Sequence, residues 1–105
     1  MGPGPEWPCE RTLTGHTDGV VSLAHWEGKL ISGSWDRTIR VWELETGGLD
    51  ATLTGHKGPV FALLVHGERL FSGSRDGSIR AWAVGTWAAV ASVEAYDVGA
   101  SEQWQ

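Results

Sequence analysis

The chain has 105 residues, of which 41% are hydrophobic and 20% are charged, and its formal net charge is −5. This length and composition fit one small globular domain. The acidic balance argues against a nucleic-acid partner, because phosphate contacts need clustered lysine and arginine. Cys9 is the only cysteine, so an internal disulfide is excluded and no cysteine cluster is available for zinc. We expect no metal and no other cofactor.

No segment of the sequence points to a membrane or to secretion. Residues 1–10 lack the apolar run of a signal peptide, and no window has the roughly 18 apolar residues of a membrane span. We therefore expect a protein without a membrane partner, located in the cytoplasm or nucleus and not secreted.

From residue 20 onward, short apolar runs alternate with turn residues. Runs rich in Val, Ile, Leu, Thr and Trp lie at residues 20–26, 29–34, 38–44 and 49–54, and glycine or acidic residues bound each run. None of the runs is long enough for a typical helix. The pattern predicts four strands, and the apolar residues on both faces predict that neighbouring layers cover the sheet.

A shift of forty residues aligns the chain with itself. Residues 11–50 and 51–90 match without an insertion, and about sixteen of the forty positions are identical. A Thr-Leu-Thr-Gly-His segment and a Ser-Gly-Ser-x-Asp segment both recur in this alignment. A fixed period of this size is typical of repeat proteins, in which each repeat is one supersecondary unit. Four further strands are therefore predicted in the second copy.

The two copies, each with a Gly-His pair and a tryptophan 26 residues later, resemble the WD (tryptophan-aspartate) repeats that build β-propellers. The resemblance implies an all-β fold with two four-stranded antiparallel blades in an incomplete ring. The blades would occupy residues 10–94, between an N-terminal tail at 1–9 and a C-terminal tail at 95–105. Strands would lie at 20–26, 29–34, 38–44 and 49–55, then at 60–66, 69–74, 78–84 and 88–94, after an extra strand at 10–15.

The resemblance also implies two buried structural hydrogen-bond sets, one in each blade. The first set is His16, Ser32, Asp36 and Trp42, and the second set is His56, Ser72, Asp76 and Trp82. An aspartate in a turn can accept bonds from backbone N–H groups and from an imidazole, and a serine can join the imidazole to an indole N–H. Each set would then hold a loop, a turn and two strands together.

Serine, histidine and aspartate could instead form a catalytic site for acyl transfer. Such a site needs an oxyanion hole and an exposed nucleophile, and the sequence has no Gly-x-Ser-x-Gly turn. Two copies at identical spacing also favour a structural role over two active sites. We therefore expect no catalytic residues and a protein that is not an enzyme.

By the same resemblance, partners would bind at the loops before the first strand and between the second and third strands of each blade. The candidate residues at these loops are Gly19, Val21, Trp35, Pro59, Phe61 and Arg75. The two copies differ at these positions, and tryptophan and arginine are frequent in interface hot spots. Trp87, near the outer edge, is open to two readings, packing or binding.

Two blades cannot close a propeller ring, which typically has about four to eight blades. The chain is therefore expected to be part of a longer propeller, or to associate with copies of itself so that three or four chains complete a ring. The function that fits best is a non-enzymatic protein-protein interaction scaffold that binds proteins or peptides. Two alternatives stay open: a fragment of a propeller-type hydrolase, and a purely structural fragment of a longer propeller.

Overall fold

The computed structural model describes residues 12–94, and the expected tails at 1–9 and 95–105 lie outside the described residues. Eight strands make up the regular structure of the described residues, with no helix among them. They are β1 (Val20–Trp26), β2 (Lys29–Ser34), β3 (Ile39–Glu43), β4 (Leu49–Leu53), β5 (Val60–His66), β6 (Arg69–Ser74), β7 (Ser78–Ala83) and β8 (Ala89–Glu94). The predicted all-β class is confirmed.

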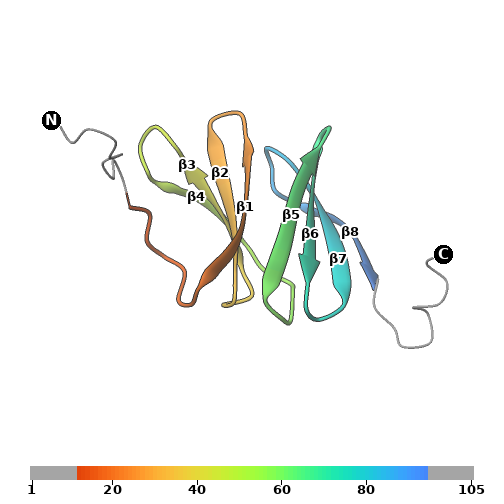
Figure 1. The fold of residues 1–105 in the computed structure, drawn as a ribbon. Helices are drawn as coiled ribbons and strands as arrows, with labels where there is room; N and C mark the ends of the chain where they lie inside the picture. Colours follow the sequence, from red (N-terminus) through yellow and green to blue (C-terminus); the bar gives the residue numbers. More distant parts are fainter. Residues whose placement is uncertain (1–11, 95–105) are drawn as a thin grey trace, which may run out of the picture.

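The strands form two four-stranded antiparallel sheets, in the orders β1-β2-β3-β4 and β5-β6-β7-β8. Each sheet is one sequence repeat, and short turns join each strand to the next. The sheets stand side by side, with β1 next to β5 and with the β1–β2 and β5–β6 turns along the upper edge (Figure 1). They are two consecutive propeller blades of an unclosed ring, as the resemblance to WD repeats implied.

The observed strands lie within two residues of the predicted bounds, but the extra strand expected at 10–15 is not formed over residues 12–15. Residues 10 and 11 lie outside the described part. The equivalent segment of the next repeat, β4, pairs with β3 of its own blade. Among the described residues, no strand pairs with residues 12–15 in a sheet ladder.

The hydrophobic core lies between the two blades, in a contact region that we call the junction. The first blade contributes Ala24, Trp26, Ile31, Ile39, Val41, Ala51 and Leu53, and the second contributes Val60, Leu63, Val65, Leu70, Trp82, Val84 and Trp87. The first group lies on one face of its sheet and the second group on the opposite face of the next sheet. Each blade therefore buries one face and leaves its other face without a neighbour in the described residues.

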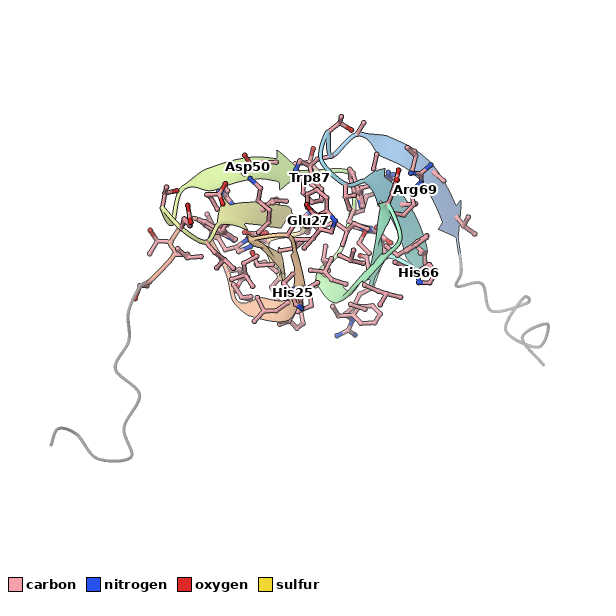
Figure 2. All side chains as sticks on the ribbon, turned by 90° about the horizontal axis from the view of Figure 1, so that it is seen from above. His25, Glu27, Asp50, His66, Arg69 and Trp87 are labelled. Atoms are coloured by element: carbon pink, nitrogen blue, oxygen red, sulfur yellow. The ribbon has the colours of Figure 1, made fainter. Side chains whose placement is uncertain are left out.

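Trp87 belongs to the junction, so of its two possible roles, packing and partner binding, the structure supports packing. Its side chain is 7% exposed, and its ring meets the ring of Trp26 edge-on with 5.8 Å between centroids. Figure 2 shows Trp87 where the two sheets meet. Its backbone has a φ of 62°, and the equivalent residue of the first blade is Gly47, with a φ of 79°. A left-handed backbone costs a non-glycine residue roughly 1–2 kcal/mol, so burial of the indole has to offset this strain.

Candidate functional site

The four side chains of the first hydrogen-bond set lie in one continuous chain of contacts. The indole N–H of Trp42 donates to Ser32 Oγ at 2.8 Å, and Ser32 Oγ is 2.7 Å from His16 Nε2. His16 Nδ1 is 2.7 Å from Asp36 Oδ2. A neutral imidazole protonated on Nδ1 satisfies all these bonds, because it donates to Asp36 and accepts from Ser32.

The second set repeats this chain with one longer contact. Trp82 donates to Ser72 Oγ at 2.9 Å, and Ser72 Oγ is 2.7 Å from His56 Nε2. His56 Nδ1 is 3.4 Å from Asp76 Oδ2 and 3.1 Å from Ser78 Oγ. His56 therefore shares its Nδ1 contact between a carboxylate and a hydroxyl.

Each aspartate also holds the backbone of two loops. Asp36 accepts from the backbone N–H groups of Thr17 and Thr38, at 3.0 and 2.8 Å. Asp76 accepts from those of Lys57 and Ser78, both at 2.7 Å. Each carboxylate thus connects the turn after the second strand of a blade to the segment that precedes the first strand.

These bonds lower the pKa of both carboxyl groups. Burial alone would raise the pKa of Asp36, but hydrogen bonds from Thr38, His16 and backbone N–H groups outweigh burial and hold the pKa well below 3.8. In Asp76, burial is likewise outweighed, by bonds from Ser78 and from backbone N–H groups. Both side chains are therefore ionised in the folded protein at neutral pH.

Burial lowers the pKa of His56 below 6.5, and the charge of Arg80 acts in the same direction, while Asp76 opposes them. The neutral form of the imidazole is therefore favoured at neutral pH. In this form, His56 Nε2 can accept a hydrogen bond from the Ser72 hydroxyl.

The distances in both sets would suit a catalytic triad, but their surroundings do not. Ser32 and Ser72 are only 3% and 1% exposed, and each Oγ already accepts an indole N–H. A nucleophile must be able to meet a substrate next to an oxyanion hole. In the described part of the chain, both serines instead fill their hydrogen-bonding capacity inside a blade.

The structure brings five of the six predicted binding residues into one groove of about 340 Å³, which we call the loop-face groove. Its lining consists of Val21, Trp35, Pro59, Phe61 and Arg75. It lies between the blades, at the edge that carries the β2–β3 and β6–β7 turns. Trp35 is 46% exposed and Phe61 is 54% exposed, so two large rings are open to solvent there. The guanidinium carbon of Arg75 lies 5.8 Å from the centre of the Trp35 ring, within the range of a cation-π contact.

The sixth candidate, Gly19, does not line the groove but lies next to the Trp35 side chain. Its carbonyl accepts the backbone N–H of Trp35 at 2.9 Å, and the carbonyl of Pro59 accepts that of Arg75 at 3.0 Å. These paired bonds fix the backbone of the two turns that carry the exposed Trp35 and Arg75 side chains.

Two β-bulges turn Val21 and Phe61 toward the loop-face groove, a feature that sequence reasoning missed. Val20 pairs with Ser34 and Ser22 with Gly33, so Val21 is an extra residue in β1. Phe61 is the extra residue at the same place in β5. A bulge re-aims side chains and is frequent beside binding sites. The only sequence signal was the recurrence of an apolar residue at this position.

Residues 12–94 contain no group of three or more His, Cys, Asp or Glu side chains that could hold a metal ion. The described residues also include no helix that is long and apolar enough to cross a membrane.

The WD domain, G-beta repeat family matches residues 7–43 and 47–83. Mitochondrial division protein 1 of Malassezia globosa is 48% identical over 44 residues, which are 42% of this chain and 6% of that protein. The probable E3 ubiquitin ligase complex SCF subunit sconB of Arthroderma benhamiae is 46% identical over 48 residues, 42% of this chain and 7% of that protein. The chain thus spans about 6% of the length of the curated relatives it matches.

Two computationally designed proteins share the fold over 81% of this chain. The crystal structures of Ika4 and Ika8 each align with a TM-score of 0.74 and 34% sequence identity. The aligned part covers 53% of the Ika4 chain and 27% of the Ika8 chain.

Proposed function

The chain belongs to the WD domain, G-beta repeat family, and from this premise we propose that it is a non-enzymatic interaction scaffold whose loop-face groove binds a protein or peptide partner. The observation that carries the proposal is the meeting of Val21, Trp35, Pro59, Phe61 and Arg75 in one groove. The two hydrogen-bond sets serve stability, since they fix the loops that border this groove.

The chemistry of the loop-face groove suits a protein partner. Exposed aromatic and arginine side chains are the residue types that contribute most to protein interfaces. Arg75 is held over Trp35, so less side-chain freedom is lost on binding than for a solvated arginine. The sconB relative is described as a subunit of an E3 ubiquitin ligase complex, which supports a role within a multiprotein assembly.

We further propose that the protein acts in the cytoplasm or nucleus. A single cysteine fits a reducing compartment, where structural disulfides are rare. Its partners would be proteins or peptides, not nucleic acid or membrane, in keeping with the net charge of −5.

A comparison of two double variants tests the loop-face groove. Trp35→Ala/Arg75→Ala removes its two turn residues. The matched control, Arg69→Ala/Val90→Ala, removes an arginine and an exposed apolar residue elsewhere, and Arg69 follows the β5–β6 turn at the start of β6. Affinity capture with quantitative mass spectrometry should show partners that the control retains and the groove variant loses at least tenfold.

Circular dichroism and urea unfolding should show that both double variants keep the fold, because all four side chains are exposed and none belongs to the core. Equal capture by the groove variant and the wild type would refute the groove as the binding site. Hydrolysis of an ester or peptide substrate by purified protein, lost in Ser32→Ala/Ser72→Ala, would instead favour the hydrolase alternative.

A further inference from the structure

The two outer sheet faces of the chain are copies of the two halves of the junction. The face of the first blade that lies away from the junction, which we call the leading face, carries Val20, Leu23, Leu30 and Leu44. Their equivalents forty residues later are Val60, Leu63, Leu70 and Val84, all in the junction. The outer face of the second blade, the trailing face, carries Leu64, Phe71, Ile79 and Val93. Their equivalents are Ala24, Ile31, Ile39 and Leu53, again in the junction.

Both outer faces expose large apolar side chains that an unassociated surface would not favour. On the leading face, Val20 is 49% and Leu23 is 61% exposed. On the trailing face, Ile79 is 40% and Val93 is 60% exposed. Contiguous exposed apolar patches mark interaction sites. The leading face also has a groove of about 850 Å³, bounded by the segment at 12–16 and by Val20, Leu23 and Leu44.

The second observation is Gly73, which lies on the trailing face. In the first blade, a Cβ on the equivalent Gly33 would meet Ser22 Oγ of its own blade, and also Val60 Cγ1 at 2.8 Å and the Val60 carbonyl oxygen at 2.9 Å across the junction. Both Ser22 and the junction therefore leave no room for a side chain there. A Cβ on Gly73 would meet only Ala62 Cβ at 3.6 Å and Phe61 Cζ at 4.0 Å.

Nothing in the described chain therefore requires glycine at position 73, although glycine inside a strand weakens the strand. Gly73 is the equivalent of Gly33, on which Val60 packs in the junction. Val20 is the equivalent of Val60, and it lies on the leading face.

We propose that the leading face of one chain binds the trailing face of a second copy, in the arrangement that the junction shows inside each chain. Val20 of one copy then packs on Gly73 of the next. The contact is heterologous, since two different faces meet, and heterologous contacts close into rings when their rotation permits. Blades of this fold form rings of about four to eight, which corresponds to two to four chains.

The contact between copies should be weaker than the junction. Ser22 Oγ donates to the Val60 carbonyl at 3.1 Å in the junction, and the equivalent of Ser22 is Ala62, which has no hydroxyl. The Trp26 and Trp87 pair is also lost, because the equivalents are His66 and Gly47. Association should therefore depend on protein concentration while each pair of blades stays folded.

Analytical ultracentrifugation of the full chain tests the proposal. The wild type should form a discrete species of two to four chains at micromolar concentration and dissociate on dilution. Leu23→Glu, on the leading face, and Ile79→Glu, on the trailing face, should each sediment as monomers. Val90→Glu, an exposed apolar position whose equivalent is Asp50, should associate like the wild type.

Mixing the two blocked variants distinguishes this contact from unspecific association. Leu23→Glu keeps its trailing face and Ile79→Glu keeps its leading face, so an equimolar mixture should form a dimer of one chain each and stop there. A wild type that stays monomeric, or a mixture that stays monomeric when the wild type associates, overturns the proposal.

Gly73→Ala tests the pairing of Val20 with Gly73 without adding a charge. A methyl group fits at this position within the chain, so the unfolding midpoint of the monomer should not fall. Association should weaken at least tenfold, because the methyl group occupies the place of Val20 of the next copy. Association equal to that of the wild type would show that the copies do not meet in the geometry of the junction.

Discussion

Ile39 and Ile79 occupy the same position in two copies of one blade, yet Ile39 is fully buried and Ile79 is 40% exposed. Val60 and Val20 differ in the same way, with exposures of 0% and 49%, as do Leu53 and Val93, with 5% and 60%. The strands around them have the same register in both blades. The difference comes from the neighbouring sheet, which is present at the junction and absent at the two outer faces.

The comparison teaches that a blade forms its ladder by itself but gains its hydrophobic stabilisation from the next blade. Backbone hydrogen bonds and the hydrogen-bond sets are complete within each repeat and its preceding loop. Burial of apolar area, which stabilises by about 25 cal/mol per Å², is concentrated at the junction. Changes at the junction should therefore be far more costly than the same changes at an outer face.

The largest expected effect is the contrast between Ile39→Ala and Ile79→Ala. Ile39→Ala should lower the free energy of unfolding by about 2–5 kcal/mol, because it leaves a cavity in the core. Ile79→Ala should cost under about 1 kcal/mol at high dilution. Urea unfolding of both variants measures the difference. Equal losses would show that the two faces are equally buried in the monomer.

The contrast between two variants of Trp87 should be smaller. Trp87→Ala removes a ring from the junction and should cost about 3–5 kcal/mol. Trp87→Gly removes the same ring but relieves the left-handed backbone, so it should be roughly 1 kcal/mol more stable than Trp87→Ala. Thermal and urea unfolding of the two variants gives this order. Trp87→Gly less stable than Trp87→Ala would contradict the strain at this turn.

The contribution of each hydrogen-bond set to stability should be similar in the two blades, because the bonds of each set lie within one blade and its preceding loop. Asp36→Ala and Asp76→Ala should each lower the free energy of unfolding by about 1–3 kcal/mol at pH 7, because each leaves buried donors without an acceptor. A loss in only one blade would show that the sets depend on the neighbouring sheet.

The cost of Asp36→Ala should also depend on pH. The folded-state pKa of Asp36 lies below the ordinary value of 3.8, so its contribution is present above about pH 4 and declines as the pH falls toward the folded-state pKa. The difference between Asp36→Ala and the wild type should therefore shrink between pH 5 and pH 3, as measured by urea unfolding. A constant difference over this range would contradict the lowered pKa.

Ser22→Ala should have the smallest effect of this series. It removes the 3.1 Å bond to the Val60 carbonyl across the junction, at a cost of about 0.5–1.5 kcal/mol. Ser92→Ala, an exposed serine on β8, serves as the control and should change stability by less than about 0.5 kcal/mol. Indistinguishable costs would mean that the Ser22 bond adds nothing to the junction.

Much of this architecture could be predicted from the sequence, because each strand is a short β-branched or aromatic run between turn residues and because the second copy repeats the first. The resemblance to a known repeat supplied the pairing of His16 with Asp36, and the loop position of Trp35 and Arg75. These features are local or recur at a fixed spacing, so they can be recognised in the sequence without the structure.

Other features depend on three-dimensional context. The bulges at Val21 and Phe61 add one residue to a short run and leave its apolar character unchanged. Trp87 lies in a left-handed turn, where backbone preferences argue against tryptophan. The repeat alone does not predict that Ile39 is buried and Ile79 is exposed, because the two residues occupy the same position in their repeats.

The segment at 54–59 connects the two blades, and its contacts decide how the chain can be divided into portable modules. His56 and the backbone of Lys57 follow β4 of the first blade, but their bonds run to Ser72 and Asp76 of the second. A second blade excised at the start of β5 would leave its own histidine behind. A segment that can be grafted or duplicated as one unit therefore begins ahead of the Gly-His pair. It starts one loop earlier than the first strand of the sheet that it forms.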